Sequence, residues 1–217
     1  MSLLDLLATR KADRDPQPAR PVAAAAAADP VFSTKALRKF VATLGRREPP
    51  VLLDLGPVVG ENISFFGEQL GCKIFVEDIF ADVERHAREG MMAALPDFFA
   101  KRLPQTAGTV DGILCWDLFD YLDRRSAPVL AEQLARVLRP DGVLLGFFGT
   151  AQAQDARYTK YVIVDQVNLR YRPYAASRQR QAPLQNRDII RLFPTLRVSD
   201  SFLLQNNVRE ILFRKPA

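Results

Sequence analysis

Carboxylates and glycines follow two apolar runs of this chain at the spacing of a nucleoside-binding site. Asp54 ends the first run, and Gly56 and Gly60 lie in the turn after it, where missing side chains let a ligand approach bare backbone. The second run, about twenty residues further on, ends in Glu77 and Asp78. A carboxylate at that place accepts hydrogen bonds from both ribose hydroxyls. The pattern predicts a nucleoside-containing cofactor.

The turn between the two glycines indicates which nucleoside is bound. A dinucleotide site has a middle glycine here and an uncluttered, positive helix start for its diphosphate, whereas this chain has Val58. Glu61 adds a negative charge to the first helical turn, which repels a diphosphate but tolerates a cofactor that carries an ammonium and a sulfonium. The turn favours S-adenosylmethionine over NAD, and an NAD-linked reductase is the less favoured alternative.

At this point the sequence resembles the class I methyltransferase family, over roughly residues 49–149 and more loosely in a closing hairpin. Four segments match in the family's order and spacing. They are Asp54-Leu55-Gly56 with Gly60 for the first glycine motif, Glu77 or Asp78 for the ribose-binding acid, residues 111–117 (DGILCWD) for the fourth strand, and residues 138–144 (LRPDGVL) for the helix-to-strand turn usually written L-[KR]-P-G-G. Asp141 replaces the first glycine of that turn.

The resemblance implies methyl transfer from S-adenosylmethionine to a nucleophilic oxygen, nitrogen or carbon. It implies cofactor contacts from Asp54, Gly56, Gly60, Glu77, Asp78, Trp116 and Asp117. A general base is needed only when the acceptor must lose a proton, and such bases come from the end of the fourth strand or from a covering loop. Asp117 is the first candidate, followed by Tyr121 and Tyr158, although Asp117 and Asp120 are equally compatible with a polar surface turn.

Two departures from the family pattern leave a second function open. The middle glycine of the first motif is absent, and the acid that usually meets the adenine amine from the third strand has no clear counterpart, Asp97 being a poor candidate. These gaps are compatible with a binding or scaffolding protein that keeps the fold without turnover.

The elements that must position these residues alternate between strand and helix. Apolar runs of strand length alternate with stretches of helical periodicity, a pattern that predicts a parallel sheet covered on both faces. We expect strands at 51–55, 72–77, 110–116 and 143–148, helices at 35–44 (capped by Ser33), 61–70, 81–89, 91–102, 129–139 and 186–193, and an antiparallel hairpin at 196–204 and 208–214. The expected fold is α/β, a Rossmann-like three-layer sandwich with a mostly parallel sheet and a C-terminal antiparallel hairpin.

The composition divides the chain into a leading segment and one domain. Residues 1–30 contain proline and a run of alanine, offer little to bury, and are interpreted as a flexible N-terminal segment and linker. Residues 31–217 form the expected methyltransferase domain. Residues 150–185 lack a clear period, and we expect a long loop that covers the acceptor site, because loops of this size are often functional.

The formal net charge of +5 is concentrated in residues 170–197, where seven arginines face one acid, Asp188. Such a segment suits an anionic partner or a solvated surface. Residues 170–174 (RYRPY) interleave cations with aromatic rings, as single-stranded RNA binders do, but lack a named RNA-binding signature. We favour a small-molecule acceptor, and nucleic acid and protein remain alternatives.

The remaining signals narrow the class of protein. No stretch approaches the roughly 20 apolar residues of a membrane span, and no secretory cleavage pattern is present, so a cytoplasmic protein is expected. One histidine, His86, expected on an exposed helix face, and two cysteines, Cys72 and Cys115, are too few to predict a metal site. The sequence predicts no oligomeric state.

Overall fold

A six-stranded sheet forms the centre of the protein, which a computed structural model describes for residues 29–45, 48–153, 158–174, 176 and 178–217. The leading segment predicted for residues 1–30 therefore lies almost entirely outside the described residues. In spatial order the strands are β3 (Lys73–Val76), β2 (Val51–Asp54), β4 (Val110–Trp116), β5 (Leu138–Gly149), β9 (Val208–Arg214) and β8 (Arg197–Leu203). The first four strands run parallel to one another, and β9 runs antiparallel to both of its neighbours, β5 and β8, so the mostly parallel sheet with a C-terminal antiparallel hairpin is confirmed.

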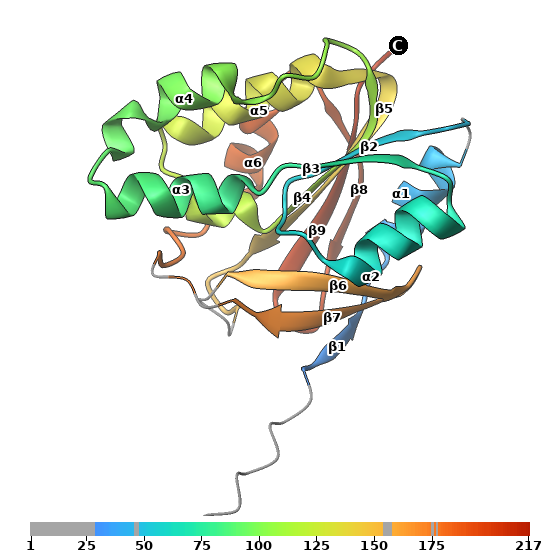
Figure 1. Cartoon of the computed structure of the whole chain (residues 1–217). Helices are drawn as coiled ribbons and strands as arrows, with labels where there is room; N and C mark the ends of the chain where they lie inside the picture. The colour runs from blue at the N-terminus through green and yellow to red at the C-terminus, as the bar shows by residue number, and fades with distance from the viewer. Residues whose placement is uncertain (1–28, 46–47, 154–157, 175, 177) are drawn as a thin grey trace, which may run out of the picture.

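Helices cover both faces of this sheet, which confirms the three-layer sandwich (Figure 1). One face carries α1 (Ala36–Leu44) and α2 (Gly60–Ile63), which continues into the π-helical turns of η1 (Ser64–Gln69). The other carries α3 (Ile79–Arg88), η2 (Met92–Ala94), α4 (Leu95–Arg102), α5 (Ser126–Val137) and α6 (Asn186–Leu192), with the short η3 (Leu118–Tyr121) after β4.

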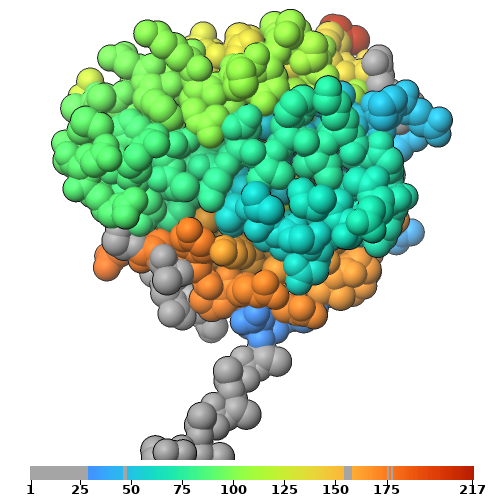
Figure 2. Space-filling model, in the orientation of Figure 1, coloured from blue at the N-terminus to red at the C-terminus, as the bar shows by residue number. Residues whose placement is uncertain are grey.

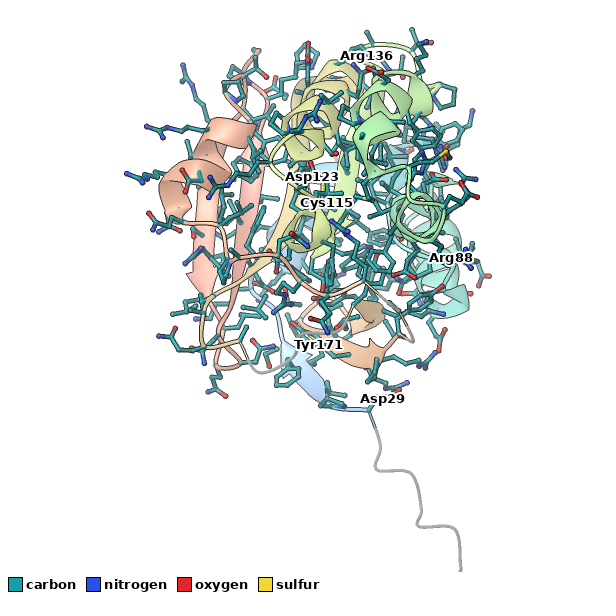
Figure 3. The ribbon with its side chains drawn as sticks, turned by 90° about the vertical axis from the view of Figure 1, so that its left-hand side faces the viewer. Asp29, Arg88, Cys115, Asp123, Arg136 and Tyr171 are labelled. Carbon is teal, nitrogen blue, oxygen red and sulfur yellow. The ribbon has the colours of Figure 1, made fainter. Side chains whose placement is uncertain are left out.

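The strands are continuous apolar runs because each packs against helices on both faces. Alternate residues of β4 supply the two cores, with Ile113 and Cys115 facing α3 to α6 and Leu114 and Trp116 facing α1 and η1. Cys115 lies at the centre of the ribbon in Figure 3. Because β4 is packed on both faces, Asp117, the residue directly after it, has a fixed position at the carboxyl end of the strand.

A second, three-stranded sheet replaces the long loop predicted for residues 150–185. Strands β6 (Thr159–Asp165) and β7 (Asn168–Pro173) form an antiparallel hairpin, and β1 (Val31–Ser33) pairs with β7. The prediction of an irregular loop is wrong here, because the two strands bury apolar and aromatic side chains, Tyr161, Val162 and Ile163 on β6 and Leu169 and Tyr171 on β7. Charged residues between the buried ones on β7, and the absence of a strict alternation on β6, hid the strands from the sequence pattern.

The small sheet lies across the end of the main sheet from which α2 starts (Figure 1). Tyr171 lies within it, and Asp29 marks the start of the described chain beside it (Figure 3). Asn62 of α2 connects the two sheets, because its amide donates to the carbonyl of Tyr161 (2.9 Å) and accepts from the amide of Ile163 (2.8 Å). Residues 158–173 therefore cover the carboxyl edge of the parallel strands.

The start of α1 also differs from prediction. Ser33 belongs to β1 and does not cap the helix, which begins at Ala36. The buried carboxylate of Glu210, on β9, accepts from the amides of Lys35 (2.9 Å) and Ala36 (3.0 Å), and the hydroxyl of Thr34 accepts from the amide of Leu37 (3.3 Å). The helix start is therefore capped by one residue close in sequence and one distant in sequence, and local sequence could not show the distant contact.

The connection between β3 and β4 contains helices and no strand. Residues 79–109 form α3, η2 and α4, so β3 is the outer strand of the six. Asp97 lies in the first turn of α4 and not at a strand end. The absent third-strand acid of the sequence therefore reflects an absent strand.

Two further expectations are corrected. Residues 140–142, predicted to turn the chain before a strand at 143–148, do interrupt the regular pairing, because Val110 pairs with Leu138 but Gly112 pairs with Val143 and Asp141 is left-handed (φ 62°). The strand β5 nevertheless begins earlier than predicted, at Leu138. His86, expected to be exposed, is buried, with Nδ1 2.7 Å from the carbonyl oxygen of Asp82 and its ring against Phe98. Within the part of the chain that the structure describes, no helix is both long enough and apolar enough to span a membrane.

Candidate active site

The carboxyl ends of three neighbouring parallel strands bring Asp54, Asp78 and Asp117 to one end of the main sheet. The region between these acids, which the protein's own aromatic side chains occupy, is called the crevice. Asp54 ends β2 and is paired with Val76 of β3 on one side and Leu114 of β4 on the other, so the acids that follow those strands lie beside it. The negative charges of all three carboxylates reach the hydroxyl of Tyr158 and, after burial, raise its pKa. The three candidate acids therefore lie at the same end of the main sheet.

Asp54 holds the glycine turn together. Its Oδ1 accepts from the amide of Gly56 (2.9 Å) and from Nε1 of Trp116 (2.6 Å). Burial raises the pKa of Asp54 to about 6, against the opposing effect of these two hydrogen bonds. The carboxylate oxygen Oδ1 of Asp54 is therefore occupied by two donors of the protein itself.

Trp116 covers Gly56. A β-bulge between Leu114 and Trp116 and a left-handed backbone (φ 49°) turn the chain at the end of β4. A Cβ on Gly56 would lie 2.8 Å from the indole, so this glycine makes room for Trp116. Gly60 has open space around it instead and starts α2. The bare backbone expected at both glycines is present only at Gly60.

Glu77 and Asp78 have different roles, which the sequence left undecided. Glu77 forms an ion pair with Arg102 (2.5 Å) and accepts from the side chain of Gln105 (3.1 Å), so both its oxygens are engaged. Asp78 uses one oxygen to cap α3 at the amide of Ala81 (3.1 Å), and burial raises its pKa. Asp78 is thus the acid of the pair that faces the crevice.

Asp117 and Asp120 form a buried cluster with Arg180. The guanidinium lies 3.8 Å from Oδ2 of Asp117 and 3.2 Å from Oδ2 of Asp120, which also accepts from the amide of Gly149 (2.7 Å). Burial and the neighbouring Asp120 raise the pKa of Asp117 well above its ordinary value. Burial raises the pKa of Asp120 to about 7, although Arg180 opposes the shift.

Tyr158 and Tyr121 are fully buried beside this cluster. The ring of Tyr158 stacks on Phe80 with centroids 3.6 Å apart and planes at 4°, and the ring of Tyr121 meets it edge-on at 5.3 Å. The hydroxyl of Tyr158 has no hydrogen-bond partner among the described residues, whereas the guanidinium of Arg180 lies 5.9 Å from the ring centroid of Tyr121. Burial raises the pKa of both, so each keeps its proton at neutral pH.

The crevice meets one of the two requirements of an S-adenosylmethionine site. The strand-end carboxylates suit the hydroxyls and the ammonium of such a ligand. The space does not fit it, because Tyr158 covers Phe80 beside Asp78, and Trp116 covers Gly56. On the face shown in Figure 2, the hairpin lies directly against α2 and α3. In this arrangement the protein's own rings take the place of a nucleoside.

A recess of about 270 Å³ lies next to the crevice, under the small sheet. Three aromatic rings, those of Phe32, Tyr161 and Tyr171, line it together with polar groups of Thr159, Arg180 and Asn206. Tyr161 stacks on Trp116, with centroids 5.2 Å apart, and Arg180 contacts the two buried aspartates, so the recess and the crevice share walls. Sequence analysis missed the recess because its residues come from four separate segments.

The arginines of the segment 170–197 point to several different places. Arg172 pairs with Asp29 (3.1 Å) and Glu61 (3.6 Å). Arg178 donates to the carbonyl of Tyr121 (2.7 Å), and Arg180 is buried. These three arginines attach residues 170–180 to the rest of the domain, whereas Arg187 and Arg191 are exposed on α6 and pair with Asp188.

Comparison with known proteins identifies the family. The model of a family described as a methyltransferase domain matches residues 31–193. The sequence matches none of the curated proteins. Similar solved structures include a 1,6-didemethyltoxoflavin-N1-methyltransferase from Burkholderia thailandensis (17% identity, 84% of this chain and 79% of that chain, TM-score 0.49) and a SAM-dependent methyltransferase from Aquifex aeolicus (14%, 83% and 87%, 0.48). These similarities are weak and do not extend to substrate.

Proposed function

Because the chain belongs to the methyltransferase domain family, we propose that it transfers a methyl group from S-adenosylmethionine to a small-molecule acceptor that binds in the recess beside Tyr161. One observation carries the proposal. Three carboxylates, those of Asp54, Asp78 and Asp117, lie at neighbouring strand ends, and Arg180, which pairs with Asp117, also lines an aromatic recess. Donor and acceptor then bind on either side of Trp116 and Tyr161.

The size and lining of the recess favour a small molecule over nucleic acid or protein. A volume of about 270 Å³ lies near the lower limit of small-ligand pockets. Its aromatic walls suit a planar ligand, and its few polar groups suit orientation of that ligand. Arg172, Arg178 and Arg180 are engaged within the protein, so they are not available to track a phosphate backbone.

The residues around the crevice supply alignment, a dry environment and a proton acceptor. Alignment in an enclosed site can lower much of the barrier of a displacement reaction. A base works best when its pKa is near the working pH. Burial raises the pKa of Asp120 to about 7, and burial together with the neighbouring Asp120 raises the pKa of Asp117 well above its ordinary value. We assign proton acceptance to Asp117, which lies behind Tyr161 and Arg180, and a positioning role to Asp120.

A second candidate function is a binding protein that keeps the fold without turnover. The filling of the crevice by Tyr158 and Trp116 favours it, as does the missing strand beyond β3. This candidate predicts a stable fold that binds a ligand in the recess and transfers no methyl group.

A labelled-methyl experiment separates these candidates. The full chain is incubated with S-adenosylmethionine carrying a labelled methyl group and with cell extract divided into small-molecule, RNA and protein fractions. We expect label in the small-molecule fraction, reduced strongly in Asp78→Asn, and mass spectrometry then identifies the acceptor. Label in RNA or protein would contradict the assigned acceptor class, and no transfer to any fraction would favour the binding protein.

A further inference from the structure

The stack of Tyr158 on Phe80 lies where the proposed cofactor must bind. Phe80 follows two residues after Asp78, so it lies at the same strand end as the acid that faces the crevice. Tyr158 directly precedes β6 and is 1% exposed. Its ring is parallel to that of Phe80, at a centroid distance of 3.6 Å, which is the arrangement of a planar base on an aromatic platform.

The hydroxyl of Tyr158 is poorly accommodated in this position. It is buried and has no hydrogen-bond partner among the described residues, and the negative charges of Asp117, Asp78 and Asp54 act on it in addition to burial to raise its pKa. A buried hydroxyl without a partner destabilises the state that contains it. The polar groups around Tyr158 therefore suit a ligand with several donors better than they suit this side chain.

Tyr158 is held partly by the rings of Phe80 and Tyr121, at centroid distances of 3.6 and 5.3 Å, and partly by contacts within residues 158–174. The amide of Tyr174 donates to the carbonyl of Tyr158 (2.9 Å), and the ring of Tyr174 meets the Tyr158 ring edge-on at 5.8 Å. The amide of Asn62 and the carbonyl of Tyr161 attach the hairpin to α2 separately. The hairpin can thus stay attached at Asn62 while Tyr158 leaves Phe80.

We infer that Tyr158 is an internal occupant of the cofactor's nucleoside subsite, and that the adenine base binds on Phe80 only when the Tyr158 ring has left it. The inference rests on the proposed function. The protein then has a closed state, with Tyr158 on Phe80, and an open state that binds cofactor. The apparent dissociation constant for cofactor then equals the dissociation constant of the open state divided by the fraction of molecules that are open.

Substitutions on the two sides of the stack test this inference, because they are expected to have opposite effects. In calorimetric titrations of the full chain with S-adenosylhomocysteine, Tyr158→Ala should bind at least roughly tenfold more tightly than the wild type. It should give weaker binding for Phe80→Ala, which loses the platform. Tyr158→Phe, the matched control, keeps the ring and removes only the unpartnered hydroxyl, so binding should be unchanged or weaker. Tyr158→Leu replaces the alanine variant if the latter does not fold.

Three other results are informative. Equal affinity in the wild type, Tyr158→Ala and Tyr158→Phe would overturn the inference and leave the proposed function intact. A parallel loss of affinity in Tyr158→Ala and Phe80→Ala would show that the stack is only structural, and would also overturn it. No binding to any folded variant would instead contradict the proposed function itself.

Discussion

The indole Nε1 of Trp116 donates a 2.6 Å hydrogen bond to Oδ1 of Asp54, across the position where Gly56 lacks a side chain. The bond joins the ends of β2 and β4 and places an aromatic ring where the glycine turn was expected to be open. Asp54 is therefore a buried acceptor whose hydrogen bonds to Gly56 and Trp116 stabilise the local structure at the end of β2.

Replacing Trp116 by Phe should destabilise the fold by about 1 to 3 kcal/mol, because one buried charged acceptor loses its donor. Urea unfolding measures this change. In a double-mutant cycle with Asp54→Asn, we expect a coupling energy of at least about 0.5 kcal/mol. Additive effects of the two substitutions would show that the bond contributes nothing to stability.

The raised pKa of Asp54 predicts how stability depends on pH. The folded protein holds this proton up to a pKa of about 6, whereas the unfolded chain releases it near 3.8, so stability is present below about pH 4 and is lost as pH rises through 6. Asp54→Asn removes this loss. Relative to the wild type, the variant should gain roughly 3 kcal/mol between pH 4 and pH 8. Parallel stability curves would contradict the assignment.

Arg180→Gln should leave Asp120 buried without its cation. The ion pair stabilises Asp120 only when the carboxylate is charged, above its pKa of about 7, so the cost should grow as pH rises through 7. At pH 8 we expect a loss of about 3 kcal/mol in thermal or urea unfolding. Arg191→Gln, at an exposed position in α6, is the matched control and should change stability by less than about 0.5 kcal/mol. A cost independent of pH would argue against this pairing.

The neighbouring acids Glu77 and Asp78 should separate stability from binding. Asp78→Asn should weaken binding of S-adenosylhomocysteine by about 10 to 100-fold, as expected for loss of a charged hydrogen-bond acceptor. Glu77→Gln should leave affinity within about threefold and lower stability, since it loses the ion pair with Arg102. Equilibrium dialysis and urea unfolding measure the two effects. The reverse assignment of effects would make Glu77 the ribose acid.

The fold could be predicted from the sequence where a local pattern decides it. Residues 110–116 form β4, as their apolar run indicates. In the C-terminal hairpin, β9 has the predicted bounds, and β8 is one residue shorter at each end than predicted. The small sheet could not be predicted in the same way. Its buried tyrosines alternate with arginine and lysine, and β1 joins it from a segment more than a hundred residues earlier.

The sequence indicated the acids of the candidate site, but it did not indicate the aromatic side chains that fill the space between them. Strand-end position alone brings Asp54, Asp78 and Asp117 together. Nothing local shows that Trp116 turns onto Gly56, because that depends on a bulge in β4, or that Tyr158 reaches Phe80. Long-range contacts of this kind are the part of the site that sequence periodicity does not contain.

The most direct test of the central claim, that the crevice between Asp54, Asp78 and Asp117 binds S-adenosylmethionine, is calorimetric titration with S-adenosylhomocysteine. The wild-type chain and Tyr158→Ala are titrated side by side, each first shown to be folded by circular dichroism. We expect saturable binding at one site per chain, tighter in Tyr158→Ala and weakened strongly by Asp78→Asn. The absence of heat from both folded proteins would contradict the claim.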